Sequence, residues 1–147
     1  DLQKVNFEHT NLEKVKFTDD IFIDVNLTGA NLNGVDLSWL DFTNATISEA
    51  DLSMTNLEGT NFNYTKLVNC DFTEAEIKGT RFEDAKITKC SFEKAKIEEA
   101  KFENANLIDC NFKKAEIRTT DFKTSELKNV NFDKNDLEEL LRQSENN

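Results

Sequence analysis

The sequence predicts a solenoid, a fold in which one short unit repeats along the whole chain. Three observations support this prediction. Apolar residues recur every five positions, a small residue precedes each large one at a fixed distance, and nothing in the 147 residues resembles a linker. A chain of this length has room for one domain. An internal repeat of this kind determines the architecture more strongly than local propensities do.

The period of five excludes ordinary helices and half-buried strands. Every fifth residue from Leu2 to Leu137 is Leu, Ile or Phe, which gives 28 matches in 28 positions, and all 12 phenylalanines fall in this register. The residue two positions earlier is nearly always small, and the residue just before is often Asn or Asp. A helix needs apolar spacings of three and four, whereas a strand needs two. A third geometry is therefore required, in which one large and one small residue of every five point inward.

This pattern resembles that of the pentapeptide-repeat family, whose motif is A(D/N)LXX. The motif occurs at Ala30–Gly34, Ala50–Met54 and Ala105–Asp109, and the resemblance extends over about 135 residues. It implies an all-β fold, a right-handed quadrilateral parallel β-helix in which four pentapeptides form the four sides of a 20-residue coil. The 28 repeats would then make about seven coils.

A 20-residue coil predicts that residues 20 apart stack and are compatible with one another. The sequence agrees, because large residues of the same kind recur at this interval. Aromatic sides then alternate with aliphatic sides in the second half, which fills a narrow interior evenly. The aromatic columns are Phe22, Phe42, Phe62, Phe82, Phe102 and Phe122, and Leu12, Leu32, Leu52, Phe72, Phe92, Phe112 and Phe132.

The end of the chain predicts a covering helix. Asn135 or Asp136 is expected to cap a helix through Leu137–Arg142, with acids early and Arg late, so that its leucines lie on the last coil. The expected parts are a β-helix over 1–135 and a capping helix with a tail over 136–147. No such element precedes Leu2, so we expect the first coil to have lost its cap or to stack against another chain or domain. Absence of an initiator Met suggests a trimmed chain.

Charge restricts the class of partner. The net charge is -11, and residues 1–75 carry 13 acids and 4 bases, a net charge of 4 - 13 = -9. This sign disfavours direct binding of nucleic acid and favours a basic partner. Residues 76–147 are nearly balanced, and Glu58, Lys78, Glu98 and Arg118 predict a structural ladder of alternating charge on one face. The chain has no apolar run of the roughly 18 residues that a membrane helix needs.

Neither the single histidine nor the cysteines indicate catalysis, a cofactor or a metal site. No Ser, Cys or acid motif around His9 provides a nucleophile and base. Cys70, Cys90 and Cys110 occupy the small inward position and lack a CxxC spacing, so we expect them in the core rather than on a metal. Free buried thiols suit a reducing compartment, which predicts a cytoplasmic protein. All four glycines lie two residues after a large residue, where the chain is expected to turn a corner.

Interruptions of the repeat are the candidate partner contacts. Asp20 replaces a small inward residue, and Ile21 and Ile23 place apolar side chains at normally exposed positions. Trp39, the only tryptophan, precedes a bulky Leu at an inward small position, and Gly59 is expected one coil beneath it. Either Trp39 packs into that gap, or it helps to anchor a partner, because aromatic anchors carry much binding energy. The candidate contact residues are Ile21, Ile23, Trp39, Met54 and Tyr64.

Three functions follow as hypotheses. The first is a non-catalytic interaction or scaffold module that binds a protein, and the family resemblance implies this for most members. The second, also implied by the resemblance, is mimicry of DNA by an acidic rod that binds DNA gyrase, which would require a homodimer through a terminal coil or the C-terminal helix. The third, an enzyme, lacks any constellation of reactive residues in the sequence.

Overall fold

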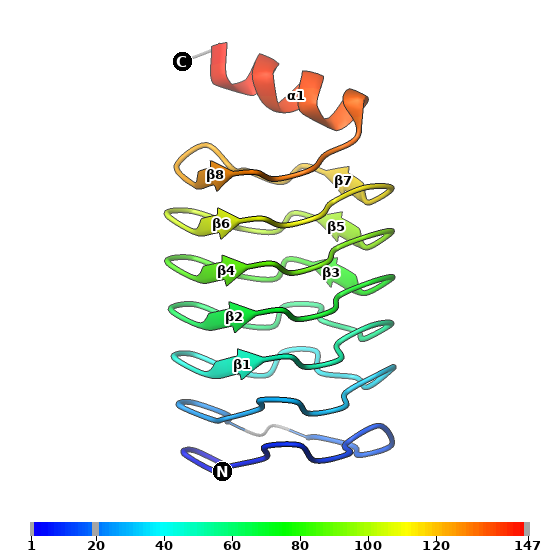
Figure 1. The fold of residues 1–147 in the computed structure, drawn as a ribbon, viewed down its shortest axis with the longest axis vertical. Coiled ribbons are helices and arrows are strands. Elements are labelled where there is room, and N and C mark those ends of the chain that lie inside the picture. The colour runs from blue at the N-terminus through cyan, green and yellow to red at the C-terminus, as the bar shows by residue number, and fades with distance from the viewer. Residues whose placement is uncertain (1, 19–20, 146–147) are drawn as a thin grey trace.

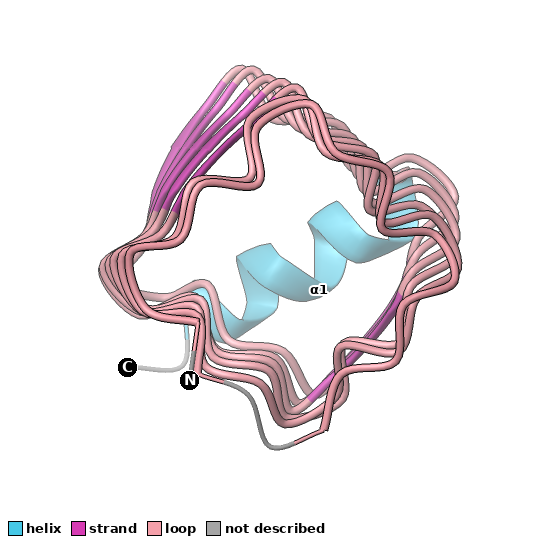
Figure 2. Cartoon of the chain, turned by 90° about the horizontal axis from the view of Figure 1, so that it is seen from below, coloured by secondary structure: helices cyan, strands magenta, loops and turns pink. Residues whose placement is uncertain are grey.

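The chain folds into a stack of four-sided coils with a helix at one end (Figures 1 and 2). The computed structural model describes residues 2–18 and 21–145, with Glu139 and residues 141–145 described by their backbone alone. Parallel bridges join residues 20 apart, from the Asn6–Asn26 pair to the Asn111–Asn131 pair. The quadrilateral β-solenoid with a short C-terminal helix, predicted from the sequence, is confirmed.

Each coil has four sides, which we number in chain order from the side that contains Phe22. Side 2 holds a five-stranded parallel sheet, and side 4 holds a three-stranded one, whereas sides 1 and 3 are joined by single bridges. The sheet of side 2 consists of β1 (Thr46–Ser48), β2 (Lys66–Val68), β4 (Lys86–Thr88), β6 (Asn106–Ile108) and β8 (Glu126–Lys128). The sheet of side 4 consists of β3 (Glu76–Lys78), β5 (Lys96–Glu98) and β7 (Glu116–Arg118).

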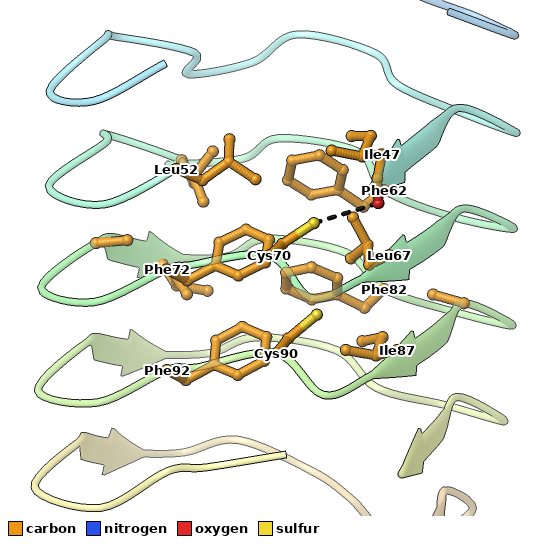
Figure 3. Close-up of a cluster of buried hydrophobic side chains, with 14 of the residues drawn as sticks. Ile47, Leu52, Phe62, Leu67, Cys70, Phe72, Phe82, Ile87, Cys90 and Phe92 are labelled. Carbon is orange, nitrogen blue, oxygen red and sulfur yellow. Dashed lines mark hydrogen bonds between the residues drawn. The ribbon is translucent and has the colours of Figure 1, made fainter. Parts of the chain in front are cut away.

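The core consists of the inward columns that the sequence predicts. On side 1, the ring of Phe82 stacks on Phe62 at 5.3 Å and on Phe102 at 4.8 Å between ring centroids. Rings of side 3 stack in the same way and meet those of side 1 edge to face, as Phe82 and Phe92 do at 6.3 Å. Figure 3 shows rings of both columns, with the aliphatic Leu67 next to Phe62 and Phe82. Both geometries are favourable for aromatic pairs.

Two local devices make the corners. The residue two after the large one adopts a positive φ in nearly every repeat, for example +65° at Gly59, +63° at Trp39 and +60° at Asn44. Such a φ is free for Gly and tolerated by Asn and Asp, which explains their enrichment there. In addition, the Asn or Asp before the large residue accepts a hydrogen bond from the amide two residues on, as Asn26 Oδ1 does from the Thr28 N–H at 3.0 Å. This Asx turn is the physical reason for the polar position of the repeat.

The C-terminal helix α1 spans Lys134–Glu145, so it begins before the predicted cap. Leu137 N–H donates to the Asp133 carbonyl at 3.0 Å, and Asp133 Oδ2 accepts from the Lys114 amide at 3.0 Å. The expectation that Asn135 or Asp136 caps the helix is therefore wrong. Because no further coil follows Phe132, the backbone satisfies its own hydrogen bonds as soon as the last coil ends.

Helix α1 covers the last coil only in part. Leu140 packs against the core, whereas Leu137 is 47% exposed, contrary to the expectation that it lies on the coil. The side chain of Leu141 lies outside the described residues. Leu127, the inward residue of β8, is 43% exposed and shows where the cover is incomplete.

Candidate functional site

The described residues offer no obvious reactive centre. Among residues 2–18 and 21–145, no helix has the length and apolar character needed to cross a membrane. In the same part of the chain, no three or more His, Cys, Asp or Glu side chains gather as a metal site would require. His9 lies at an exposed corner, and its Nε2 is 3.7 Å from Glu8 Oε1.

The three cysteines are free thiols inside the core. Cys70 Sγ donates to the Ile47 carbonyl at 3.2 Å (Figure 3), and Cys110 Sγ donates to the Ile87 carbonyl at 3.4 Å. A hydrogen bond to Cys70, together with burial, raises the pKa of the Cys90 thiol, and burial raises the pKa of Cys110. Because the thiolate is the nucleophile and metal ligand, these two thiols lack the reactivity of catalytic cysteines.

The structure places the three bulky candidate contacts at corners, each with a positive φ. The exposed fractions are 74% for Trp39, 55% for Met54 and 60% for Tyr64. Chain order assigns Tyr64 to the corner between sides 1 and 2, Met54 to that between sides 3 and 4, and Trp39 to that between sides 4 and 1. Their side chains consequently do not form one patch around a single corner.

Two further candidates lie on side 1, which the corners of Trp39 and Tyr64 border. Ile21 and Ile23 flank the buried Phe22, and Ile21 is 38% exposed and bridges to Asp41. Asp20, the neighbouring interruption of the repeat, lies outside the described residues. Four of the five predicted contacts therefore border side 1, whereas Met54 lies away from it.

Trp39 forms one end of a groove that runs along its corner. Its ring lies across Gly59 one coil further on, where a Cβ would come within 2.4 Å of Trp39 Cε3. Gly79 follows after another coil, with nothing within 4 Å of the corresponding Cβ position. The groove has a volume of about 560 Å³ and is lined by Trp39, Glu58, Gly59, Lys78, Gly79, Arg81, Glu99 and Lys101. Trp39 thus packs on Gly59 and remains exposed, so the two alternatives for this residue are compatible.

Positive charge gathers at the other end of this corner groove. Arg81 and Lys101 are directly bridged neighbours on side 1, and Lys78 lies across the corner on β3. Within the described part of the chain, none of these three cations takes part in an ion pair. Lys78 does stack on Glu98, as the predicted ladder requires, although the two side chains make no ion pair.

Sequence reasoning missed these cations as part of a site. The repeat pattern places Lys78 in the structural ladder and gives no role to the stacking of Arg81 on Lys101. The signal was nevertheless present, because Trp39, Gly59 and Gly79 are spaced by 20 residues and the cations follow the same spacing. Two glycines that follow a Trp in one corner column predict an open surface beside that Trp.

A second groove lies where the first coil departs from the pattern. Lys16 makes no bridge to Asp36, although the neighbouring Asn11–Asn31 and Asp36–Asn56 pairs are formed. The resulting space of about 700 Å³ is lined by Val15, Phe17 and other residues of 13–18, by residues 33–36 and by Met54. Exposure of Val15 reaches 40%. Met54 therefore contributes to a surface distinct from the corner groove.

The comparisons with known proteins give the family. A family model described as a pentapeptide repeat region matches residues 33–102 and 85–140, which together form more than half of the chain. The chain belongs to the pentapeptide-repeat family and is a repeat-protein module. A search of curated proteins finds no match.

One solved structure supports the fold, and two more distant ones are similar to the chain. The chain is 29% identical to a pentapeptide repeat protein from the Arabidopsis thaliana thylakoid lumen, with a TM-score of 0.62, over 65% of this chain and 66% of that one. It thus spans slightly less than two thirds of that protein. Identity is 23% to Rfr23 from the cyanobacterium Cyanothece 51142 (TM-score 0.45, 91% and 84% covered). It is 18% to QnrB1, a plasmid-mediated fluoroquinolone resistance protein (TM-score 0.41, 96% and 83% covered).

Proposed function

We propose that this chain is a non-catalytic interaction module that binds a protein partner through its corners. The observation that carries the proposal is the exposure of Trp39, Met54 and Tyr64 at corners with positive φ. A non-Gly residue pays about 1 to 3 kcal/mol for such a backbone conformation. Large apolar side chains at these positions contribute little to the core, so their use is best explained by contact with another molecule.

The type of partner follows from the surface. Aromatic residues and Met are enriched in the cores of protein–protein interfaces, and a rigid backbone lowers the entropy lost on binding. The net charge of -11 opposes direct binding of nucleic acid. We also propose a cytoplasmic location, which the three free thiols support.

Site-specific photo-crosslinking tests this proposal. A photoreactive residue is placed at position 39, 54 or 64 of the full chain, which is then incubated in an extract of its native cells. Position 84 is the matched control, because Asp84 occupies the same corner as Tyr64 one coil further on. We expect one recurrent protein to be trapped from at least one apolar corner and not from position 84. Equal, diffuse labelling from all four positions would contradict the proposal.

The alternative function is mimicry of DNA toward a DNA-binding protein such as gyrase. It is supported by the net charge of -9 in residues 1–75, from 13 acids and 4 bases. Against it, the outward row Asp41, Asn61, Arg81 and Lys101 on side 1 changes sign along the axis. A supercoiling assay with gyrase, run beside light scattering, distinguishes the two. Inhibition or protection by a homodimer, abolished by charge reversal in the first half, would replace the first proposal.

A further inference from the structure

We propose that the corner groove binds a short acidic segment of the partner in an extended conformation. A bulky apolar side chain of that segment packs on Trp39, and its carboxylates meet Arg81 and Lys101. This inference rests on the proposed function, since it assumes a protein partner, and it adds the chemistry by which that partner is recognised.

Trp39 provides the apolar contact. Its side chain is 74% exposed although it packs on Gly59, so most of the indole is open to a ligand. Gly59 lies under the ring, and Gly79, one coil further on, has nothing within 4 Å of its Cβ position, which leaves an open surface that a peptide backbone can approach closely. Trp is among the residues most often found as energetic anchors of interfaces.

Arg81 and Lys101 provide the polar contact. Like charges directly opposite on paired strands repel each other, and no acid of the described residues pairs with either side chain. A carboxylate placed between them would relieve this repulsion, and Arg can hold it with two parallel hydrogen bonds. Lys66 and Lys86 form a similar stack on side 2, but neither lines the corner groove.

The charge of the whole molecule selects a short acidic ligand over a long one. A net charge of -11 repels an extended polyanion such as nucleic acid at long range. The local cluster of Lys78, Arg81 and Lys101 can compensate only a few negative charges, and Glu58 and Glu99 at its edges limit the patch. Neutral ligands would gain nothing from the three cations. A peptide with one or two acids next to an apolar residue fits both the local and the overall charge.

The spacing of the coils predicts the spacing of the peptide. Arg81 follows the corner two coils beyond Trp39, and Lys101 follows the corner three coils beyond it, which is about 10 Å and about 14 Å at ~4.8 Å per coil. An extended chain advances ~3.3 Å per residue. The acids should therefore lie about three and four residues from the apolar anchor.

Fluorescent peptides test this inference with the full chain. The probe is Phe-Ser-Ser-Glu-Glu, made also in the reverse order, and binding is followed by anisotropy and by the emission of Trp39, the only tryptophan. We expect one of the two orders to bind saturably and to shift the tryptophan emission. Peptides with Ala in place of Phe, with Gln in place of Glu, or with the acids adjacent to the Phe should each bind about tenfold more weakly.

Variants of the protein locate the binding. Trp39→Ala should weaken binding about tenfold, whereas Asn69→Ala, at an exposed corner between sides 2 and 3, should leave it unchanged. The double variant Arg81→Gln/Lys101→Gln should also weaken it about tenfold and reduce its salt dependence, whereas Lys66→Gln/Lys86→Gln should not. Circular dichroism checks that each variant is folded.

Several outcomes would overturn the inference. These are no binding of either peptide, equal binding of the Gln peptide, equal effects of the two double variants, or tighter binding of a short oligonucleotide at the same residues. If crosslinking at the corners traps a protein but the peptides fail, the proposed function stands and the acidic segment is excluded. If the peptides bind but no protein is trapped, the proposed function is the part that fails.

Discussion

The first coil and the middle coils are built from the same repeat, yet they differ in packing. From Phe42 to Phe112, the phenylalanines of sides 1 and 3 are at most 1% exposed. In the first coil, by contrast, Phe7 and Phe17 are only partly buried, and Lys16 does not pair with Asp36. Each coil of a solenoid is stabilised by the coils it packs against, and within residues 2–18 and 21–145 the first coil packs against one other coil. The same five-residue repeat therefore contributes differently to the free energy of unfolding according to its place in the stack.

Removal of one Phe ring should show the difference between the middle coils and the first coil most clearly. Phe82→Ala leaves a cavity between two stacked rings and should cost about 3 to 5 kcal/mol of the free energy of unfolding. Phe7→Ala, at the partly covered end, should cost about half as much or less. Urea unfolding followed by circular dichroism measures both. Equal losses would mean that the first coil is as well packed as the middle.

The C-terminal cover should show a smaller effect. Leu140 packs against the core, so Leu140→Ser should weaken the contact of α1 with the last coil by about 1 to 2 kcal/mol. Leu137→Ser is the matched control, since that side chain is 47% exposed. Hydrogen exchange should accelerate at the amides of β8 and remain unchanged at β1 in the first variant. Faster exchange in both strands would indicate that the solenoid unfolds as one unit.

Substitution of the two groove glycines should lower the free energy of unfolding by about 1 kcal/mol each, which tests the role of positive φ at the corners. Gly59→Ala and Gly79→Ala both place a Cβ at positive φ, and each should cost about 1 kcal/mol. Only Gly59→Ala should also displace the indole of Trp39, because the added Cβ would meet the ring. Tryptophan emission and urea unfolding, measured together, separate the two effects. An emission change in both variants would show that Trp39 responds to strain rather than to contact.

The smallest expected effect is the pH dependence of stability that Asp136 produces in the first turn of α1. Burial and the neighbouring Asp133 raise the pKa of Asp136. A raised carboxyl pKa means that the ionised form is disfavoured in the folded state, so the folded chain gains stability as pH falls from neutral through this pKa. Asp136→Asn should therefore stabilise the chain at pH 7 by less than about 0.5 kcal/mol and have no such effect in acid. Thermal unfolding at both pH values, with Glu138→Gln as control, measures this.

Inward and corner positions could be predicted from the sequence because their residue types report their environment. Leu, Ile and Phe every five residues identify the core, and Gly, Asn and Asp identify the positive φ. The start of α1 and the broken pairing at Lys16 could not be predicted, because both depend on packing against the adjacent coil rather than on local residue type. Nor was the corner groove found as a unit, since it combines outward side chains from several successive coils.

The side chain at each corner of the coil does not affect the packing of the core. Trp, Gly, Glu, Lys and Asn occupy it with nearly the same backbone torsion, and the rings stacked inside do not change with them. The corners thus form columns of surface positions about 4.8 Å apart, at which side chains can be exchanged one at a time. A solenoid of this kind can acquire or lose a binding specificity by a few surface substitutions. Its corner positions therefore allow a new binding surface to be designed without any change to the core.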